Sequence, residues 1–377
     1  MNILVTGSKG FIGQNVRAWL ARMPEHRVWE IDIDDTPEDL AAATAAADVV
    51  FHLAGVNRPT NQDEFRVGNV EFTAQLCNLL TRRDSAPALV LSSSVQALLD
   101  NPYGASKRQA EELVRAYGER TGGRVTIYRL PNVFGKWCRP DYNSAVATFC
   151  HNIARDLPVT ISDPDRQLEL VHVDDVVRCW LRELDRRESS AVSYQSVAPT
   201  FPITLGRLVE MIRSFRAMRP TLLVPDLDAF SRKLYATYLS YLDEDDLAYD
   251  LQQRDDNRGR LAEFIKSETF GQIFVSRTRP GITRGNHYHH TKTEKFLVLD
   301  GEAMIRFRHV LTERVIEYRV RGDDLRVVDI PPGYTHSIEN VGSGELITLF
   351  WASEVFNPQE PDTYALTVKH EPSAATP

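Results

Sequence analysis

The stretch Thr6-Gly7-Ser8-Lys9-Gly10-Phe11-Ile12-Gly13 decides the fold of the first half of the chain. It follows a short apolar run that starts at Asn2, and it precedes an amphipathic stretch that ends at Met23. Glycines at positions 7, 10 and 13 permit a tight turn and let a pyrophosphate approach the backbone at the helix N-terminus. The pattern predicts a dinucleotide-binding strand–turn–helix unit, with an ordinary turn of the same kind as the alternative.

Outward from this turn, short apolar runs alternate with helical patterns up to about residue 185. We expect strands at 28–33, 49–53, 88–92 and 125–128, and helices at 41–47, 72–81 and 107–117. Strands that alternate with helices at this spacing predict a parallel sheet with helices on both faces. The fold class of this part is therefore α/β, with a doubly wound, Rossmann-type sheet.

A second motif, Tyr103-Gly104-Ala105-Ser106-Lys107, places a phenol and an ammonium one helical turn apart, after the helix-starting pair Asn101-Pro102. The ammonium favours the phenolate, so we expect the pKa of Tyr103 to be lowered toward neutrality. Three serines, Ser92 to Ser94, lie upstream at the end of an apolar strand, where open α/β sheets bind ligands. The combination predicts a carbonyl-reducing site, and a solvated helix face is the alternative.

Residues 1 to about 240 resemble the extended short-chain dehydrogenase/reductases, most of which act on nucleotide-sugars. Besides the glycine turn, the serines and the Tyr–Lys pair, the resemblance rests on His52-Leu53-Ala54-Gly55, Arg129 to Gly135 and Val171 to Asp175. It implies that Tyr103 is the acid/base, that Lys107 also holds the nicotinamide ribose, and that Ser94 polarises the substrate carbonyl. Ser93 remains a rival, because only eight residues separate Ser94 from Tyr103, fewer than most members have.

The resemblance also implies a cofactor site and a substrate site. The cofactor-binding residues are Gly7, Gly10, Phe11, Ile12, Gly13, Asp32, Leu53, Ala54 and Lys107, and the substrate-binding residues are Arg58, Asn132 and Asn143. The cofactor's 2′ position stays open at this stage. Asp32 or Asp34 would accept hydrogen bonds from a free ribose hydroxyl and favour NADH, whereas Lys9 and Arg58 could neutralise the 2′-phosphate of NADPH. The whole-chain resemblance given below favours NADPH.

The pattern changes after the acidic run Asp243-Glu244-Asp245-Asp246, which cannot be packed in a core. Short strands with turn residues between them follow at 272–276, 295–299, 303–307, 315–320, 325–330, 337–340 and 346–351. This spacing predicts an all-β barrel or double-sheet sandwich. We expect one domain at 1–243, a second at 247–370 and a flexible tail at 371–377.

Histidines and one glutamate mark the second domain as a candidate metal site. His287 and His289 alternate, so on a strand both face the same side; Glu294 follows, and His336 could return from another strand. Three imidazoles and a carboxylate suit a divalent ion such as Zn, Mn, Fe or Ni. Histidines without a metal are the alternative.

This region resembles the cupins. The spacing G(X)5HXH(X)4E(X)6G matches from Gly281 to Gly301, and PxGxxHxxxN matches from Pro331 to Asn340. The resemblance assigns His287, His289, Glu294 and His336 as ligands, with His290 as a neighbour that could compete with His289. We expect Zn: four protein ligands nearly close its shell and favour a structural ion, although an ion with an exchangeable position could polarise a keto oxygen.

As a whole, the chain resembles the bifunctional epimerase/reductases of capsule and O-antigen biosynthesis, of the CapF type. Shared segments include Asn57-Arg58-Pro59, Phe134 to Cys138, Tyr142-Asn143-Ser144 and Thr237 to Tyr241. The resemblance implies a homodimer whose cupin epimerises C3 of a UDP-2-acetamido-2,6-dideoxy-L-arabino-hexos-4-ulose. The reductase domain would then reduce the C4 ketone with NADPH to UDP-N-acetyl-6-deoxy-L-talosamine, on the route to N-acetyl-L-fucosamine.

Two other functions stay open. In the first, the cupin only binds sugar or holds a dimer together, and the chain is a single-activity reductase. In the second, the chain is a non-catalytic nucleotide sensor, against which the intact set of Ser94, Tyr103 and Lys107 argues.

Composition excludes several other classes of protein. Lys plus Arg is 44 and Asp plus Glu is 52, so the net charge of −8 offers no basic excess for nucleic acid. No apolar run approaches the ~20 residues of a membrane helix, and no basic N-terminal region precedes an apolar one, so we expect a cytoplasmic protein. The four scattered cysteines form no CxxC pair and are expected to be reduced thiols.

Overall fold

The computed structural model describes residues 1–61, 63–186, 192–251, 253–256, 259–262, 265, 271–354 and 357–369; the expected tail at 371–377 lies outside them. The chain divides into two compact units. The first comprises Met1–Ala145 and Gln167–Ile203, and the second comprises Val146–Arg166 and the chain from Thr204 onward. The expected change of pattern near residue 243 therefore falls within the second unit, and the domain limits stay a prediction.

A six-stranded parallel sheet, in the order β2-β1-β3-β4-β5-β8, forms the centre of the first unit. Its strands are β1 (Asn2–Thr6), β2 (Arg27–Ile31), β3 (Val49–His52), β4 (Ala88–Ser94), β5 (Val125–Leu130) and β8 (Val192–Gln195). The strand order changes direction between β1 and β3. Open α/β sheets bind ligands beyond the carboxyl ends of the strands at such a switch point. The predicted Rossmann-like parallel sheet is confirmed.

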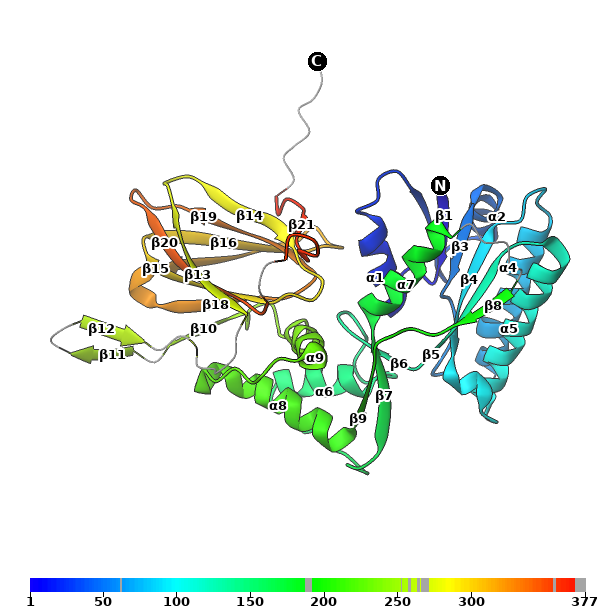
Figure 1. Cartoon of the computed structure of the whole chain (residues 1–377), viewed down its shortest axis with the longest axis horizontal. Coiled ribbons are helices and arrows are strands. Elements are labelled where there is room, and N and C mark those ends of the chain that lie inside the picture. The colour runs from blue at the N-terminus through cyan, green and yellow to red at the C-terminus, as the bar shows by residue number, and fades with distance from the viewer. Residues whose placement is uncertain are drawn as a thin grey trace, which may run out of the picture. The chain divides into compact units, whose positions relative to one another are not determined.

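Helices cover both faces of this sheet (Figure 1). One face carries α1 (Phe11–Leu20) and α7 (Val173–Asp185), and the other carries α2 (Pro37–Ala46), α4 (Phe72–Thr81) and α5 (Pro102–Thr121). Alternation along the buried strands makes this possible, since Ile3 and Val5 of β1 pack toward α1 and α7 while Leu4 packs toward the other helices. The sequence therefore builds two apolar cores, one on each side of the sheet.

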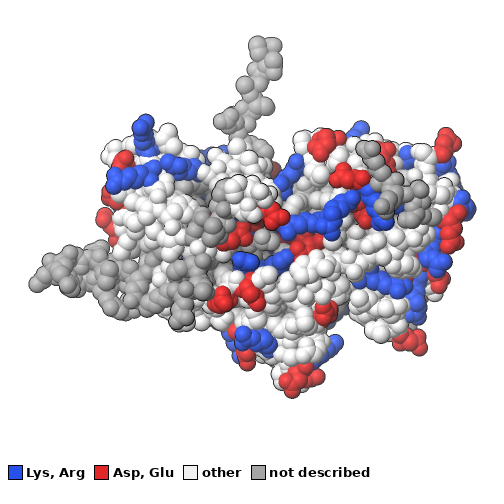
Figure 2. Space-filling view, in the orientation of Figure 1, with Lys and Arg blue, Asp and Glu red and all other residues white. Residues whose placement is uncertain are grey.

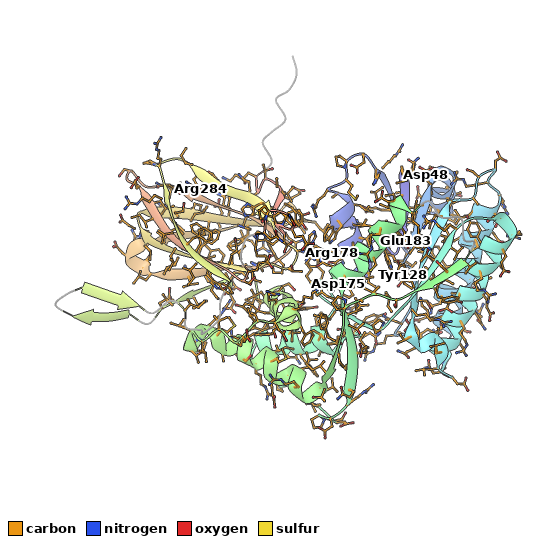
Figure 3. The ribbon with its side chains drawn as sticks, in the orientation of Figure 1. Asp48, Tyr128, Asp175, Arg178, Glu183 and Arg284 are labelled. Carbon is orange, nitrogen blue, oxygen red and sulfur yellow. The ribbon has the colours of Figure 1, made fainter. Side chains whose placement is uncertain are left out.

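On the α7 face, several buried polar side chains are paired around Glu183. Tyr128 of β5 points toward Glu183 of α7, and its hydroxyl donates to that carboxylate at 3.1 Å (Figure 3). Thr126 donates to the same carboxylate at 3.0 Å, and Arg124 forms an ion pair with it. Beside them, the ring of Trp180 stacks on Phe51 of β3 with 6.1 Å between ring centroids. These contacts fix α7 against the sheet.

Short elements complete the first unit. They are α3 (Asp63–Phe65), the π-helix η1 (Arg66–Glu71), the 3-10 helix η2 (Val95–Leu98) and a small sheet of β6 (Asn132–Phe134), β7 (Gln167–His172) and β9 (Thr200–Thr204).

The second unit contains two five-stranded antiparallel sheets, in the orders β10-β18-β15-β20-β13 and β17-β16-β19-β14-β21. The strands of the first sheet are β10 (Ala248–Asp250), β13 (Gln272–Thr278), β15 (Glu294–Asp300), β18 (Arg326–Ile330) and β20 (Leu346–Ala352). Those of the second are β14 (Thr283–Tyr288), β16 (Glu302–His309), β17 (Val315–Arg321), β19 (Tyr334–Asn340) and β21 (Tyr364–Ala365). Phe296 of the first sheet contacts His336 of the second, so the inner faces meet. The predicted β-structure of this part is confirmed as antiparallel sheets, and the cupin barrel stays a prediction.

Helices α6 (Ala145–Ala154), α8 (Leu205–Thr221) and α9 (Ala229–Leu239) belong with these sheets, as do the hairpin of β11 (Gln253–Asp256) and β12 (Gly259–Ala262) and the 3-10 helix η3 (Gly322–Asp324). Phe215 of α8 packs on Tyr235 and Tyr238 of α9. Among the described residues no helix is long and apolar enough to cross a membrane. On the face shown in Figure 2, Lys and Arg are interspersed with Asp and Glu, as the nearly balanced composition predicts.

Candidate active site and candidate metal centre

The glycine turn forms a cradle between β1, α1 and the end of β3. Gly7 has φ +68°, and a Cβ there would lie 2.6 Å from the amide nitrogen of Ala54, which follows Leu53 after β3. A Cβ on Gly13 would lie 2.1 Å from the carbonyl oxygen of Gly7. Only glycine fits at these two positions, so the backbone amides at the start of α1 stay accessible to a pyrophosphate. The cradle fits a nicotinamide dinucleotide, and it gathers most of the predicted cofactor-binding residues.

Asp32 closes one side of this cradle. It follows β2, and its carboxylate accepts the backbone N–H of Lys9 at 2.6 Å. The ammonium of Lys9 is paired with the exposed carboxylate of Asp34 at 2.8 Å. Asp32 and Asp34, which favour NADH, therefore lie beside the glycine turn together with Lys9, one of the two residues that favour NADPH.

The predicted reducing group assembles where β4 ends and α5 begins. Asn101 caps α5, its side-chain oxygen accepting the N–H of Gly104 at 2.8 Å. Tyr103 in the first turn forms a hydrogen bond with Ser94 at the end of β4. One turn later, the Lys107 ammonium donates to the carbonyl oxygen of Ser92 at 2.8 Å. A phenol, a hydroxyl and an ammonium thus meet at the carboxyl end of the sheet.

The electrostatics of Tyr103 differ from the expectation. Burial raises the pKa of Tyr103 above its usual value, and the hydrogen bond with Ser94 only partly offsets this. Burial also lowers the pKa of Lys107 to about 8, while the nearby Glu111 carboxylate opposes the change. The expected lowering of the Tyr103 pKa by Lys107 was wrong, because desolvation of the phenolate is the largest effect and the group that opposes it is Ser94. At neutral pH Tyr103 therefore carries a proton that it can donate.

The two serines at the end of β4 have different surroundings. The Ser93 side chain is buried and donates to the Glu111 carboxylate, whereas Ser94 is partly exposed and faces Tyr103. Successive strand residues point to opposite sides, which explains the difference. This geometry favours Ser94 over Ser93 as the hydroxyl that meets a substrate.

The predicted substrate-binding residues lie in two places of the first unit. Arg58 donates to the carbonyl oxygens of Asp141 and Tyr142, which brings it beside the loop that carries Asn143. Asn132 lies on β6, and its side chain donates to the carbonyl oxygen of Glu169 at 3.2 Å.

The four predicted metal ligands converge between the two sheets of the second unit. One ligand atom from each of His287, His289, Glu294 and His336 lies within 4.8 Å of the others. The Nε2 atoms of His289 and His336 are 3.3 Å and 3.4 Å from the same oxygen of Glu294, and neither makes a hydrogen bond of good geometry. Buried imidazole nitrogens that point at one carboxylate without being bonded to it are suited to a shared cation.

Protonation states support the same interpretation. Burial, together with the neighbouring imidazoles of His336 and His289, lowers the pKa of His287 to about 3, and burial also lowers the pKa of His336. Although burial alone would raise it, the pKa of Glu294 is held well below its usual value by His289 and His336. Neutral imidazoles and an ionised carboxylate are the forms that bind a divalent ion.

Two residues next to these ligands in the sequence, His290 and Lys295, lie apart from the cluster. His290 is buried between the rings of Tyr288 and Tyr364, so it does not compete with His289. Lys295 points to the opposite face of β15 from Glu294, where it pairs with Asp329 at 2.5 Å. Although burial lowers it, the pKa of Lys295 is raised well above its usual value, chiefly by Asp329, so Lys295 stays protonated.

Three supporting residues were missed from the sequence. Asp362 accepts the N–H groups of His290 and Lys292, and its carbonyl oxygen bonds the Nδ1 atom of His289, which turns Nε2 toward the centre. Asn69 of η1 pairs with the backbone of Val56. Glu111 could have been found, because it continues the helical spacing of Tyr103 and Lys107; the other two give no local signal.

The cradle and the serine–tyrosine–lysine group define the class of the protein. The chain belongs to the NAD dependent epimerase/dehydratase family, whose model matches residues 3–195. A second model, the polysaccharide biosynthesis C-terminal domain, matches residues 254–364.

Similar proteins narrow the class. The UDP-2-acetamido-2,6-beta-L-arabino-hexul-4-ose reductase of Pseudomonas aeruginosa is 45% identical over 369 residues, which are 98% of this chain and 99% of that protein. Among solved structures, the capsular polysaccharide assembling protein CapF from Staphylococcus aureus has 47% identity and a TM-score of 0.67, and the match covers 97% of this chain and 100% of that one. The UDP-glucuronic acid 4-epimerase of Bacillus cereus, in complex with NAD, shares only the fold: 20% identity, TM-score 0.52, 58% of this chain and 84% of that one.

Proposed function

We propose that this chain is a bifunctional nucleotide-sugar enzyme of capsular polysaccharide biosynthesis. Its first unit would reduce the C4 ketone of a UDP-2-acetamido-2,6-dideoxy-hexos-4-ulose with NADPH, after the C-terminal sheets, acting as a cupin, epimerise C3 of the L-arabino form. The product would be UDP-N-acetyl-6-deoxy-L-talosamine. The observation that carries the proposal is the meeting of Ser94, Tyr103 and Lys107 beside a dinucleotide cradle. The near full-length similarity to a reductase of this substrate class supports it.

The proposed reduction needs a hydride, a proton and a polarised carbonyl. When bound, NADPH supplies the hydride that C4 receives. Tyr103 donates its proton to the C4 oxygen, and its raised pKa keeps that proton available at neutral pH. Ser94 donates a hydrogen bond to the same oxygen, and Lys107 holds the nicotinamide ribose. C4 thereby becomes a secondary alcohol, and the phenolate regains its proton from solvent.

For the C3 step, a ketone at C4 acidifies the C3 proton, so removal and return of that proton can invert the centre. We propose that His287, His289, Glu294 and His336 hold Zn²⁺. Bound there, the ion would either stabilise the two sheets or polarise the keto oxygen. Lys295 is not proposed as the base, because it is buried, protonated and on the opposite face.

The experiment supplies the UDP-4-keto sugar to the full-length protein and identifies the products by mass spectrometry and NMR, with and without NADPH. Reduction only with NADPH, giving the talo product, supports both activities. Reduction with C3 unchanged supports the second candidate, a single-activity reductase, and the absence of reduction contradicts the proposal.

A further inference from the structure

Helix α5 contacts the end of β4 through one face, at three successive levels. Tyr103 bonds Ser94, Lys107 bonds the carbonyl oxygen of Ser92, and Glu111 accepts from Ser93. The three helix residues are spaced by four, so they form one row along α5, while the three serines are consecutive on the strand. These three contacts hold α5 against the strand end that carries Ser94 of the proposed reducing group.

Glu111 is the innermost member of this row and is buried at 2% exposure. Its carboxylate accepts the Ser93 hydroxyl and two donors of the Arg129 guanidinium, at 3.0 Å and 2.6 Å. Arg129 lies opposite Ser93 in the pairing of β4 with β5 and stacks over the ring of Tyr194. A buried carboxylate costs much free energy unless it is paired in this way. None of the proposed chemical steps uses this carboxylate.

The surroundings of Lys107 show what the carboxylate does. The side chain is 7% exposed. On α5 it lies between the neutral Tyr103 and Glu111; from β4 it meets the Ser92 carbonyl oxygen; from β3 it faces His52, which burial keeps neutral with a pKa of about 3. The side-chain amide of Asn69, on η1, and the Lys107 ammonium both lie near Gly55. Of these groups, only Glu111 is negatively charged.

We propose that Glu111 is a positioning residue of the reductase site, which keeps the Lys107 side chain in its ammonium form and holds α5 to the strand end that carries Ser94. This inference deepens the proposed reductase function and rests on it. Its physical basis is that a desolvated ammonium is stabilised by a nearby counter-charge, and residues four apart on a helix are neighbours on one face. The pKa of Lys107 is lowered to about 8 by burial even with Glu111 in place, so loss of the counter-charge would lower it further.

The test measures the pH profile of kcat/KM for NADPH-dependent reduction, and of NADPH affinity by fluorescence, in four full-length proteins. In the unchanged protein both fall above about pH 8, as Lys107 loses its proton. Glu111→Gln should move this fall, the alkaline limb of both profiles, to lower pH by about one unit or more. Glu112→Gln, at the exposed neighbouring position of α5, should leave it in place. Arg129→Gln should move it to higher pH, since Lys107 becomes the main cation beside the carboxylate.

Opposite shifts in the Glu111 and Arg129 variants support the inference, because a purely structural role would lower stability without moving the limb in two directions. A folded Glu111→Gln protein with an unshifted limb overturns it. If that variant does not fold, the direction found with Arg129→Gln decides, and no upward shift overturns the inference. An unchanged protein that does not reduce the 4-keto sugar contradicts the proposed function instead, and the inference is then decided from NADPH affinity alone.

Discussion

Tyr103 keeps its proton at neutral pH because its side chain is buried, and this suits it to the proposed role of proton donor. Its ring is largely buried and packs 5.7 Å from that of Phe65, so a phenolate would lose its hydration. The resulting rise in pKa suits reduction of a ketone, in which the oxygen must gain a proton. The pKa of Tyr103 is therefore set mainly by burial, and the neighbouring Ser94 has a smaller effect.

At the same scale, Lys9 should distinguish the two nicotinamide cofactors. Lys9→Ala removes the ammonium beside the glycine turn and should raise the KM for NADPH a few-fold, with little change for NADH, because only a 2′-phosphate needs a cation there. Asp34→Asn frees the same ammonium and should lower the KM for NADPH. Steady-state rates with each cofactor measure both effects, and equal changes for NADPH and NADH would contradict the NADPH assignment.

At the scale of elements, periodicity predicts most of the first unit. Apolar strands and amphipathic helices locate the sheet, and α5 begins at Pro102 with Asn101 as its cap, as the pair Asn101-Pro102 predicts. The alternation of His287 and His289 also predicts that both side chains point to the same side of the strand, and Glu294 lies with them in the cluster.

Contacts between distant segments could not be predicted. The bond from His289 to the carbonyl oxygen of Asp362 and the ion pair of Arg219 with Asp329 join residues far apart in sequence, which no local pattern reports. The pKa of Tyr103 was misjudged for a related reason, since burial depends on the whole unit.

The buried ion pairs of Asp329, which include Lys295 of β15, should contribute much of the stability of the second unit. Asp329 is 1% exposed and pairs with Lys295 and with Arg219 of α8. Asp329→Ala leaves two buried cations without this partner and should lower the free energy of unfolding by about 3–5 kcal/mol. Urea unfolding measures the change, with Asp323→Ala, an exposed position on η3, as the control. A loss no larger than that of the control would show that the network is not stabilising.

The proposed metal site draws its residues from around three strands, and it should fail when one of them is removed. His287→Ala removes one imidazole from the four-residue cluster and should lower the content of divalent metal in the purified protein. Elemental analysis by mass spectrometry measures this, and His309→Ala on β16, outside the cluster, should keep the metal. Unchanged protein with no metal, purified without chelator, would refute the site.

At the scale of the whole molecule, the two proposed kinds of chemistry are assigned to two compact units. The first carries the cradle and the reducing group, and the second carries the histidine–glutamate cluster. Such a division makes the activities separable by mutation, because no residue of one group belongs to the other unit. The homodimer implied by family resemblance stays a prediction at this scale.

Whether the two proposed activities can be separated is tested most directly with the full-length Tyr103→Phe protein in D₂O, given the UDP-4-keto sugar and NADPH. Two quantities are measured together: NADPH oxidation by absorbance, and deuterium at C3 of the sugar by NMR. The account predicts that oxidation is lost, because the proton donor is gone, while deuterium enters C3 as fast as in the unchanged protein. Wild-type oxidation by the variant, or no deuterium at C3 in either protein, would contradict it.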